Sequence, residues 1–232
     1  PTPASSLALV QRLPLGVVAA IVPWNFPLST TAWKLAPALA TGNSVILKPA
    51  TNTPLTALRI AQLAAEAGLP DGVLHVLPGS GGSLGKHLAT HMDIDGLTFT
   101  GSTPVGQLLM QYSGQSNLKR TFLELGGKSP NIIFADANLE AAASMAAVAV
   151  FYNGGQTCTA GTRLIVEESI RDQFLEMVIE NARGWMPGDP MDPATTMGPM
   201  IDSGQFDNVA DYVDIGRGEG AELVFGGNRC MA

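Results

Sequence analysis

Short apolar runs alternate with amphipathic stretches through the first half of the chain. Five runs rich in Val, Ile and Leu have the character of strands, and four stretches between them have helical spacing of apolar residues. The predicted strands are residues 17–22, 44–47, 73–77, 97–99 and 121–125, and the predicted helices are residues 30–40, 55–67, 83–91 and 104–112. Near-continuous apolar strands are typical of a sheet covered on both faces, and strand–helix alternation favours parallel pairing. The pattern therefore predicts an α/β fold with a doubly wound, mostly parallel sheet.

The residues that begin and end helices agree with this assignment. Pro54 and Pro104 stand near the starts of two predicted helices, where the missing backbone N–H is tolerated. Gly42 and Gly68 follow the ends of two of them, as helix-terminating glycines do.

The pattern restarts after Gly126 and Gly127, where we place a domain boundary. A strand at 131–134 and an alanine-rich helix at 139–152, buried nearly all round, come first. The remaining predicted segments are a loop at 153–161, a strand at 163–167, an amphipathic helix at 170–185, a Pro/Gly-rich surface segment at 186–204, and a strand and turn at 222–228. We therefore expect a second α/β region.

Composition narrows the class of protein. The chain has 232 residues, 46% of them hydrophobic and 14% charged, which is globular composition. Its net charge is −7 and it has no basic cluster, so we expect neither a nucleic-acid partner nor an anionic membrane partner. Apolar runs are too short to cross a bilayer, and residues 1–14 lack the pattern of a secretory signal. Two cysteines imply no disulfide framework, so a cytoplasmic location is expected.

The two ends of the chain suggest a piece of a longer protein. Pro1 is not an initiating methionine, and the chain stops soon after the predicted strand and turn at 222–228. We therefore expect further segments outside this sequence.

Cys158 is the first candidate for chemistry. It closes the polar, glycine-containing segment at 153–158, between a predicted helix and a predicted strand. A thiol acts as a nucleophile only as thiolate, in a partly exposed place with backbone donors nearby. The alternative is that Cys158 is a small buried hydrophobic residue, and Cys230, near the terminus, keeps that interpretation.

Glu124 is the second candidate. It lies in a predicted strand that ends at a pair of glycines. Burial without a partner would raise the pKa of its carboxyl toward the value that suits a general base. The alternative is an acid at a strand end that pairs with a cation or faces water.

Three further features follow predicted strands. Asn25, between Pro23 and Pro27, carries an amide that could donate to an oxyanion, or it caps the following helix. Gly101 and Ser102 lead into a helix N-terminus, a natural site for a diphosphate, although any strand–glycine–helix turn shares this form. Lys48 ends a strand at the edge where such sheets bind ligands, or it is a solvated lysine.

Taken together and in order, these segments closely resemble the aldehyde dehydrogenase superfamily over essentially the whole chain. They are PWNFP at 23–27, KP at 48–49, the turn at 101–106, ELGGKSP at 124–130 and GQTC at 155–158. The resemblance implies a Rossmann-like cofactor domain followed by part of a second α/β catalytic domain. It assigns residues 1–14 to an oligomerisation segment, 15–126 to the cofactor domain and 127–232 to the first half of the catalytic domain.

The resemblance also implies the reaction, which is NAD(P)+-dependent oxidation of an aldehyde to a carboxylic acid. Cys158 attacks the aldehyde carbon, and the Asn25 side chain and the Cys158 backbone N–H hold the thiohemiacetal oxyanion. Glu124 then activates the water that hydrolyses the thioester. Lys34 is a partner in the proton path, or a solvated helix residue. The implied cofactor contacts are Lys48 at the adenosine ribose, Gly101 and Ser102 at the diphosphate, and Trp24 along the cleft. No metal is expected, and the parent is expected to be a homodimer or homotetramer.

Two departures from the family pattern matter. Many NAD-specific members carry Glu three residues after the ribose-binding lysine, whereas this chain has Thr51, so the cofactor is NAD or NADP. The family's later EIFGPV element is absent, so we expect these 232 residues alone to have negligible activity.

We expect the substrate to be an aldehyde, and the motif sequences favour one class of aldehyde over others. Residues 91–95, 128–136 and 158–163 look most like the branch that acts on amino- and guanidino-aldehydes from polyamine breakdown. Enzymes that act on phenylacetaldehyde and betaine aldehyde share much of the sequence of these segments. The alternatives are a CoA-acylating or phosphorylating semialdehyde dehydrogenase, against which Glu124 counts, and a noncatalytic family member, against which the presence of both Cys158 and Glu124 counts.

Overall fold

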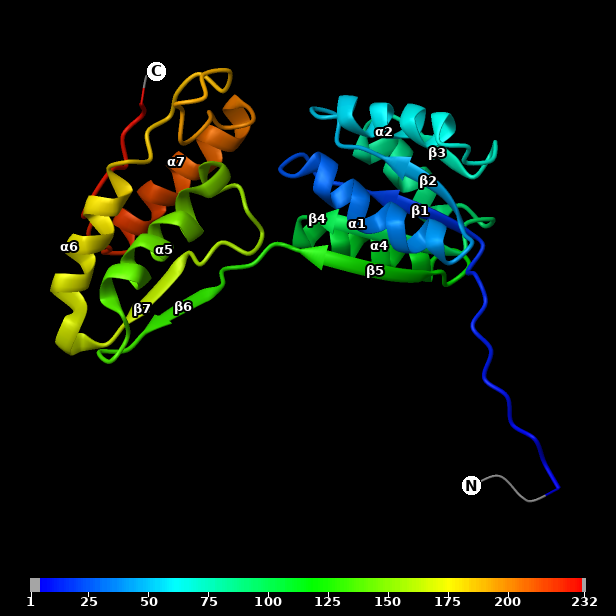
Figure 1. The fold of residues 1–232 in the computed structure, drawn as a ribbon, viewed down its shortest axis with the longest axis horizontal. Helices are drawn as coiled ribbons and strands as arrows, with labels where there is room; N and C mark the ends of the chain where they lie inside the picture. The colour runs from blue at the N-terminus through cyan, green and yellow to red at the C-terminus, as the bar shows by residue number, and fades with distance from the viewer. Residues whose placement is uncertain (1–4, 231–232) are drawn as a thin grey trace. The chain divides into compact units, whose positions relative to one another are not determined.

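The computed structural model describes residues 5–230. The backbone divides into two compact units, Pro1–Leu125 and Gly126–Ala232, next to the glycine pair at 126–127 (Figure 1). The first four residues of the predicted oligomerisation segment lie outside the described residues. No helix among those described is both long and apolar enough to cross a membrane.

The first unit alternates strands and helices throughout. Its elements are β1 (Val17–Ile21), α1 (Pro27–Ala40), β2 (Ser44–Lys48), α2 (Leu55–Glu66), β3 (Leu74–Val76), the π-helical turn η1 (Gly81–Gly85), α3 (Lys86–Thr90), β4 (Gly96–Gly101), α4 (Thr103–Gly114) and β5 (Arg120–Leu125). All five predicted strands and all four predicted helices are present, with ends shifted by a few residues.

The sheet of this unit is parallel, with strand order β3-β2-β1-β4-β5. The chain moves outward from β1 through β2 to β3, then returns to the other edge of β1 with β4 and continues to β5. The predicted doubly wound sheet is therefore confirmed. Its direction of winding reverses between β1 and β4, and sheets of this kind bind ligands outside the carboxyl ends of the strands at such a point.

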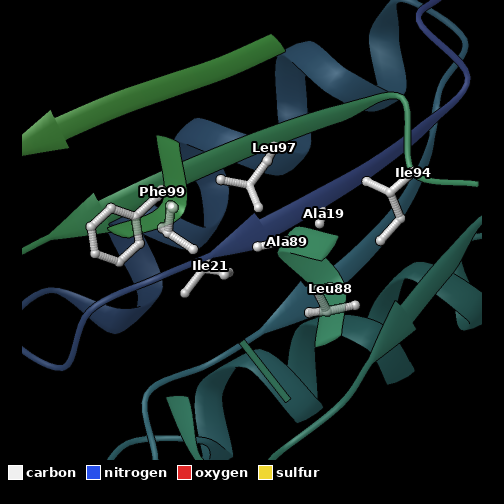
Figure 2. Close-up of a cluster of buried hydrophobic side chains, with 8 residues drawn as sticks. Ala19, Ile21, Leu88, Ala89, Ile94, Leu97 and Phe99 are labelled. Atoms are coloured by element: carbon white, nitrogen blue, oxygen red, sulfur yellow. The ribbon is translucent and has the colours of Figure 1, made fainter. Parts of the chain in front are cut away.

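Helices cover both faces of the central strands. Because side chains alternate along a strand, β1 sends Ala19 and Ile21 to one face and Ala20 and Val22 toward the other. The layer with α3 and α4, most of which Figure 2 shows, consists of Ala19, Ile21, Leu88, Ala89, Ile94, Leu97, Phe99 and Leu109. The layer with α1 and α2 consists of Ala20, Val22, Leu35, Val45, Leu47 and Ala57.

The sheet of the second unit has two strands, fewer than the five of the first unit. Its elements are β6 (Pro130–Ile133), α5 (Leu139–Phe151), the 3₁₀ turn η2 (Tyr152–Gly155), β7 (Arg163–Val166), the 3₁₀ turn η3 (Glu168–Ile170), α6 (Arg171–Ala182) and α7 (Ser203–Gly218). The strands β6 and β7 pair in parallel. Ile133, Ala143 and Phe174 form the buried centre where α5 and α6 pack on this sheet.

Two predictions for the second unit were wrong in detail, and one helix was missed. The alanine-rich helix α5 is buried along Ala143, Ala146 and Ala147, whereas Met145 is 60% exposed, so burial is one-sided. Residues 222–228 form no strand, because no described strand pairs with them. The helix α7 was not predicted, although Phe206, Val209 and Val213 recur at helical spacing in it. None of its residues is fully buried.

Candidate functional site

A cleft of about 350 Å³ lies in the first unit, at the carboxyl end of the sheet and at the reversal point between β1 and β4. The residues directly after β1 and at the end of β4 line it, together with the end of β2 and the wall made by η1 and α4. All five predicted cofactor residues line this cleft: Trp24, Lys48, Thr51, Gly101 and Ser102. Parallel pairing brings them together, because it places the carboxyl ends of β1, β2 and β4 at one edge.

Lys48 is the last residue of β2 and is only 4% exposed. Its Nζ donates to the Pro49 carbonyl oxygen at 2.9 Å, and burial lowers the pKa of its ammonium group. The interpretation of Lys48 as a solvated lysine is therefore wrong. Thr51, three residues later, is exposed, and its Oγ1 donates to the Gly79 carbonyl oxygen at 3.4 Å.

Ser102 occupies the N-cap position of α4, yet its side chain makes no capping hydrogen bond. The hydroxyl and the first N–H groups of α4 therefore meet at one wall of the cleft, in the form expected of a diphosphate contact. Gly101, just before it, must lack a side chain, because a Cβ there would overlap the Phe99 ring.

The cleft is also lined by glycines of η1 that sequence reasoning missed. Gly81, Gly82 and Gly85 of η1 line the cleft, and a Cβ added at any of them would meet nothing within 4 Å. None of the three has a positive φ, so neither packing nor backbone conformation in this unit requires glycine. Their common effect is to leave space in the cleft. The available signal was the Gly-Ser-Gly-Gly segment at 79–82, which breaks the apolar pattern ahead of α3.

Asn25 precedes α1, which begins at Pro27 with Phe26 as the N-cap. The Asn25 Oδ1 accepts a hydrogen bond from the Phe26 N–H at 3.1 Å, and no side-chain capping bond is made at the N-cap. In an amide side chain the Nδ2 group is the donor, so this is the part of Asn25 that could serve an oxyanion.

Lys34 and Glu124 are coupled electrostatically in the first unit. Lys34 of α1 is 9% exposed, and its Nζ donates to Thr98 Oγ1 of β4 at 3.0 Å. Burial lowers the pKa of Lys34 to about 8, and the negative charge of Glu124 partly opposes that shift. The interpretation of Lys34 as a solvated residue is wrong. Glu124 itself, on the edge strand β5, is exposed, so the burial considered for this side chain is not found.

Cys158 belongs to the second unit and is partly exposed, as a reactive thiol requires. Three successive residues before it have positive φ: Asn153 at 54°, Gly154 at 64° and Gly155 at 74°. The side chain of Gln156 holds the loop, since its Nε2 donates to the Asn153 carbonyl and its Oε1 accepts from the Ile201 N–H, both at 3.0 Å. The loop that carries Cys158 is thus specifically shaped. Cys230 is exposed, so its interpretation as a buried residue is wrong.

Comparison with known proteins decides the family. The model of the aldehyde dehydrogenase family matches residues 1–232, the whole chain. This chain belongs to the aldehyde dehydrogenase family. The predicted family is therefore confirmed, and its solved members share the fold.

Individual family members match over 94–100% of this chain. The NADP/NAD-dependent aldehyde dehydrogenase PuuC of Escherichia coli (strain K12) is 54% identical over 232 residues, covering 100% of this chain and 47% of PuuC. An indole-3-acetaldehyde dehydrogenase solved in complex with NAD+ has a TM-score of 0.97 and 59% identity, covering 100% of this chain and 47% of that one. The gamma-glutamyl-gamma-aminobutyraldehyde dehydrogenase of Burkholderia cenocepacia J2315 has a TM-score of 0.92 and 56% identity, covering 94% of this chain and 44% of that one. The chain thus spans about half the length of the relatives it matches.

Proposed function

We propose that the protein oxidises an aldehyde to a carboxylic acid with NAD+ or NADP+, using Cys158 as the nucleophile. The observation that carries this proposal is the cleft of the first unit, where the five predicted cofactor residues gather at the reversal point of a doubly wound sheet. In this proposal the first unit is the cofactor domain and the second is the first half of the catalytic domain.

The cleft fits a dinucleotide in its chemistry. Its walls are largely apolar, since Val105, Leu108 and Leu109 of α4 line it together with the bare glycines of η1, which suits a flat purine ring. Lys48 would hold the adenosine ribose, and the N-terminus of α4 with Ser102 would hold the diphosphate. When bound, the oxidised nicotinamide supplies the hydride acceptor of the reaction.

Side chains and a backbone N–H of the protein carry out the other steps of the proposed reaction. The Cys158 thiolate adds to the aldehyde carbon, and the Asn25 amide with the Cys158 N–H stabilises the oxyanion of the thiohemiacetal. After oxidation to the thioester, Glu124 takes a proton from water, which attacks the acyl carbon and releases the acid and the thiolate. We assign the relay of that proton to Lys34, whose pKa lies near 8 and is raised in part by the charge of Glu124.

Two substitutions in the full-length protein test this assignment. Cys158→Ala should abolish acid production while leaving dinucleotide binding nearly intact, because the thiol does chemistry and does not hold the cofactor. Glu124→Gln should still give a burst of reduced cofactor and then stall at the thioester. Turnover that persists in Cys158→Ala would overturn the role of the thiol, and loss of the burst in Glu124→Gln would show that this residue acts before hydrolysis.

We propose amino-aldehydes as the substrate class. This rests on the motif wording described above and on the 56% identity to an enzyme named for gamma-glutamyl-gamma-aminobutyraldehyde. The 59% identity to an indole-3-acetaldehyde dehydrogenase makes that aldehyde the direct competitor. A panel of 4-aminobutyraldehyde, its gamma-glutamyl derivative, betaine aldehyde and indole-3-acetaldehyde should give the highest kcat/KM for one of the first two. A preference for the indole compound would refute the assignment.

We also propose that both cofactors are used, with kcat/KM values within about tenfold of each other, a difference of about 1.4 kcal/mol. Thr51 supports this, because it places a hydroxyl and no negative charge at the ribose end of the cleft. Thr51→Glu should lower kcat/KM for NADP+ and leave NAD+ use largely intact, since a carboxylate repels a phosphate. Outright rejection of NADP+ by the unaltered protein would contradict the proposal.

A homodimer or homotetramer is proposed for the full-length protein. Between residues 5 and 14, Leu7, Leu9, Val10 and Leu13 are each more than 70% exposed, and a row of exposed apolar side chains is typical of a segment that a partner covers. Light scattering should detect the oligomer, and replacing these four residues by Ser should shift it toward the monomer. A monodisperse monomer of the unaltered protein would contradict this proposal.

A further inference from the structure

The cleft of the first unit carries two ammonium groups and no carboxylate. Lys48 and Lys86 line it, and none of the described residues that line it is Asp or Glu. This is notable in a chain whose net charge is −7. A concave surface with charge of one sign and apolar walls concentrates its field, so this cleft favours an anionic ligand.

The ammonium groups of the two lysines differ in how firmly other groups of the protein hold them. Lys48 is buried and its Nζ is held by the Pro49 carbonyl oxygen. Lys86 is exposed, and its Nζ lies 5.7 Å from the centroid of the Tyr112 ring, which also lines the cleft. Among residues 5–230, Lys86 takes part in none of the ion pairs. A cation–π contact at a partly exposed ring is weak, so Lys86 has an ammonium group available for a ligand.

The location of Lys86 separates it from the expected diphosphate contact. Ser102 and the first N–H groups lie at the N-terminal end of α4, whereas Lys86 directly follows η1 and its Nζ lies over Tyr112, near the C-terminal end of α4. The segment that enters η1 is tied to Thr51, because Thr51 Oγ1 donates to the Gly79 carbonyl oxygen. Between Gly79 and Lys86, Gly81, Gly82 and Gly85 present no side chains to the cleft.

We propose that Lys86 is a specificity-determining residue whose ammonium group pairs with the phosphate monoester on the adenosine ribose of NADP+. In doing so it moves from the Tyr112 ring into the cleft. The phosphate meets no opposing carboxylate there, and Lys86 adds the mobile cation that the buried Lys48 does not provide. This inference rests on the proposed function, because it takes the cleft to be the dinucleotide site.

Binding of two nucleotide probes to the full-length protein tests the inference without turnover. Adenosine 2′,5′-bisphosphate carries the additional phosphate and adenosine 5′-monophosphate lacks it. Isothermal titration should show that Lys86→Gln weakens the bisphosphate about tenfold and changes the monophosphate less than about twofold, since a charge-assisted hydrogen bond is lost from one probe only. Lys86→Arg should retain most of the preference. Arg59→Gln, which removes an exposed charge of the same unit outside the cleft, should leave both affinities unchanged.

Each other outcome has a definite meaning. Equal weakening of both probes in Lys86→Gln would place the ammonium group on the part of the nucleotide that they share, and no weakening would remove it from the site. Either result overturns the role of Lys86. If the unaltered protein bound neither probe, the cleft would not be the dinucleotide site, and the proposed function would fail instead. Because Lys86 is exposed, an unchanged melting temperature is expected for both Lys86 variants.

Discussion

Lys34 shows how one buried residue can make stability depend on pH. It is 9% exposed, its ammonium group donates to Thr98 Oγ1, and burial lowers its pKa to about 8. Unfolding returns the side chain to water and to its ordinary pKa of 10.5. The folded state therefore carries the full cost of the buried charge below about pH 8. That cost is relieved as the pH rises from about 8 to 10.5, where the unfolded chain retains the proton that the folded chain has lost.

Lys34→Met should therefore raise the free energy of unfolding at pH 7, by about 1–3 kcal/mol. The gain should shrink at pH 9.5, because the lysine of the unaltered protein is then largely neutral in the fold. Urea unfolding at both pH values measures the difference, and Lys128→Met, which removes an exposed lysine, serves as the control. A variant less stable than the parent at pH 7, or a gain that does not change with pH, would show that the buried charge is not costly.

At the scale of elements, the glycines of the π-helical turn η1 leave space in the cleft and are not required by packing. Gly85 is buried and has helical φ and ψ of −61° and −43°, which any residue can adopt. A Cβ at this position would meet no protein atom within 4 Å. Its absence leaves room in the cleft, and π-helical turns are frequent at functional sites.

Stability and binding should consequently move in opposite directions at Gly85. Gly85→Ala should keep or raise the melting temperature, since alanine is favoured over glycine in a helix by about 0.5–1 kcal/mol. The affinity for NAD+ should fall several-fold in Gly85→Ala and more than about tenfold in Gly85→Leu, as the added side chain occupies the cleft. Gly114 of α4 also has open space at its Cβ but does not line the cleft, so Gly114→Leu is the matched control. Unchanged NAD+ affinity in Gly85→Leu would remove η1 from the cofactor site.

At the scale of the whole molecule, the chain consists of two compact units whose roles differ. The residues assigned to adenosine binding all belong to the first unit, whereas Cys158 belongs to the second. ADP, which carries the adenosine half of the cofactor, should therefore slow amide exchange in η1, at the end of β2 and at the start of α4. The strands β6 and β7 and the helix α6 should exchange at unchanged rates. Hydrogen exchange with mass spectrometry measures this, and greater protection in the second unit would contradict the assignment.

The sequence by itself determined the elements of the first unit and their pairing class. Several of its strands are near-continuous apolar runs, such as β1, and glycines such as Gly42 and Gly68 adopt the positive φ that ends a helix, so local pattern and structure agree. The motifs around Asn25, Glu124 and Cys158 were sufficient for the family, because their chemistry depends on residue type at close spacing. The outer segments of the second unit were not determined in this way. Helix α7 has no buried face, and residues 222–228 have apolar side chains but no neighbouring strand.

Tertiary structure alone decided which residues share a site and which are buried. Lys34 and Lys48 have the appearance of solvated lysines in sequence, yet parallel pairing and helix packing enclose both and lower their pKa values. Glu124 looks enclosed in sequence, yet it lies on the edge strand β5 and is exposed. Only the three-dimensional structure shows that one cleft is lined both by α4 and by Gly81, Gly82, Gly85 and Lys86. The physical reason is that burial and electrostatic environment depend on contacts between segments far apart in the chain, which the local order of residues does not encode.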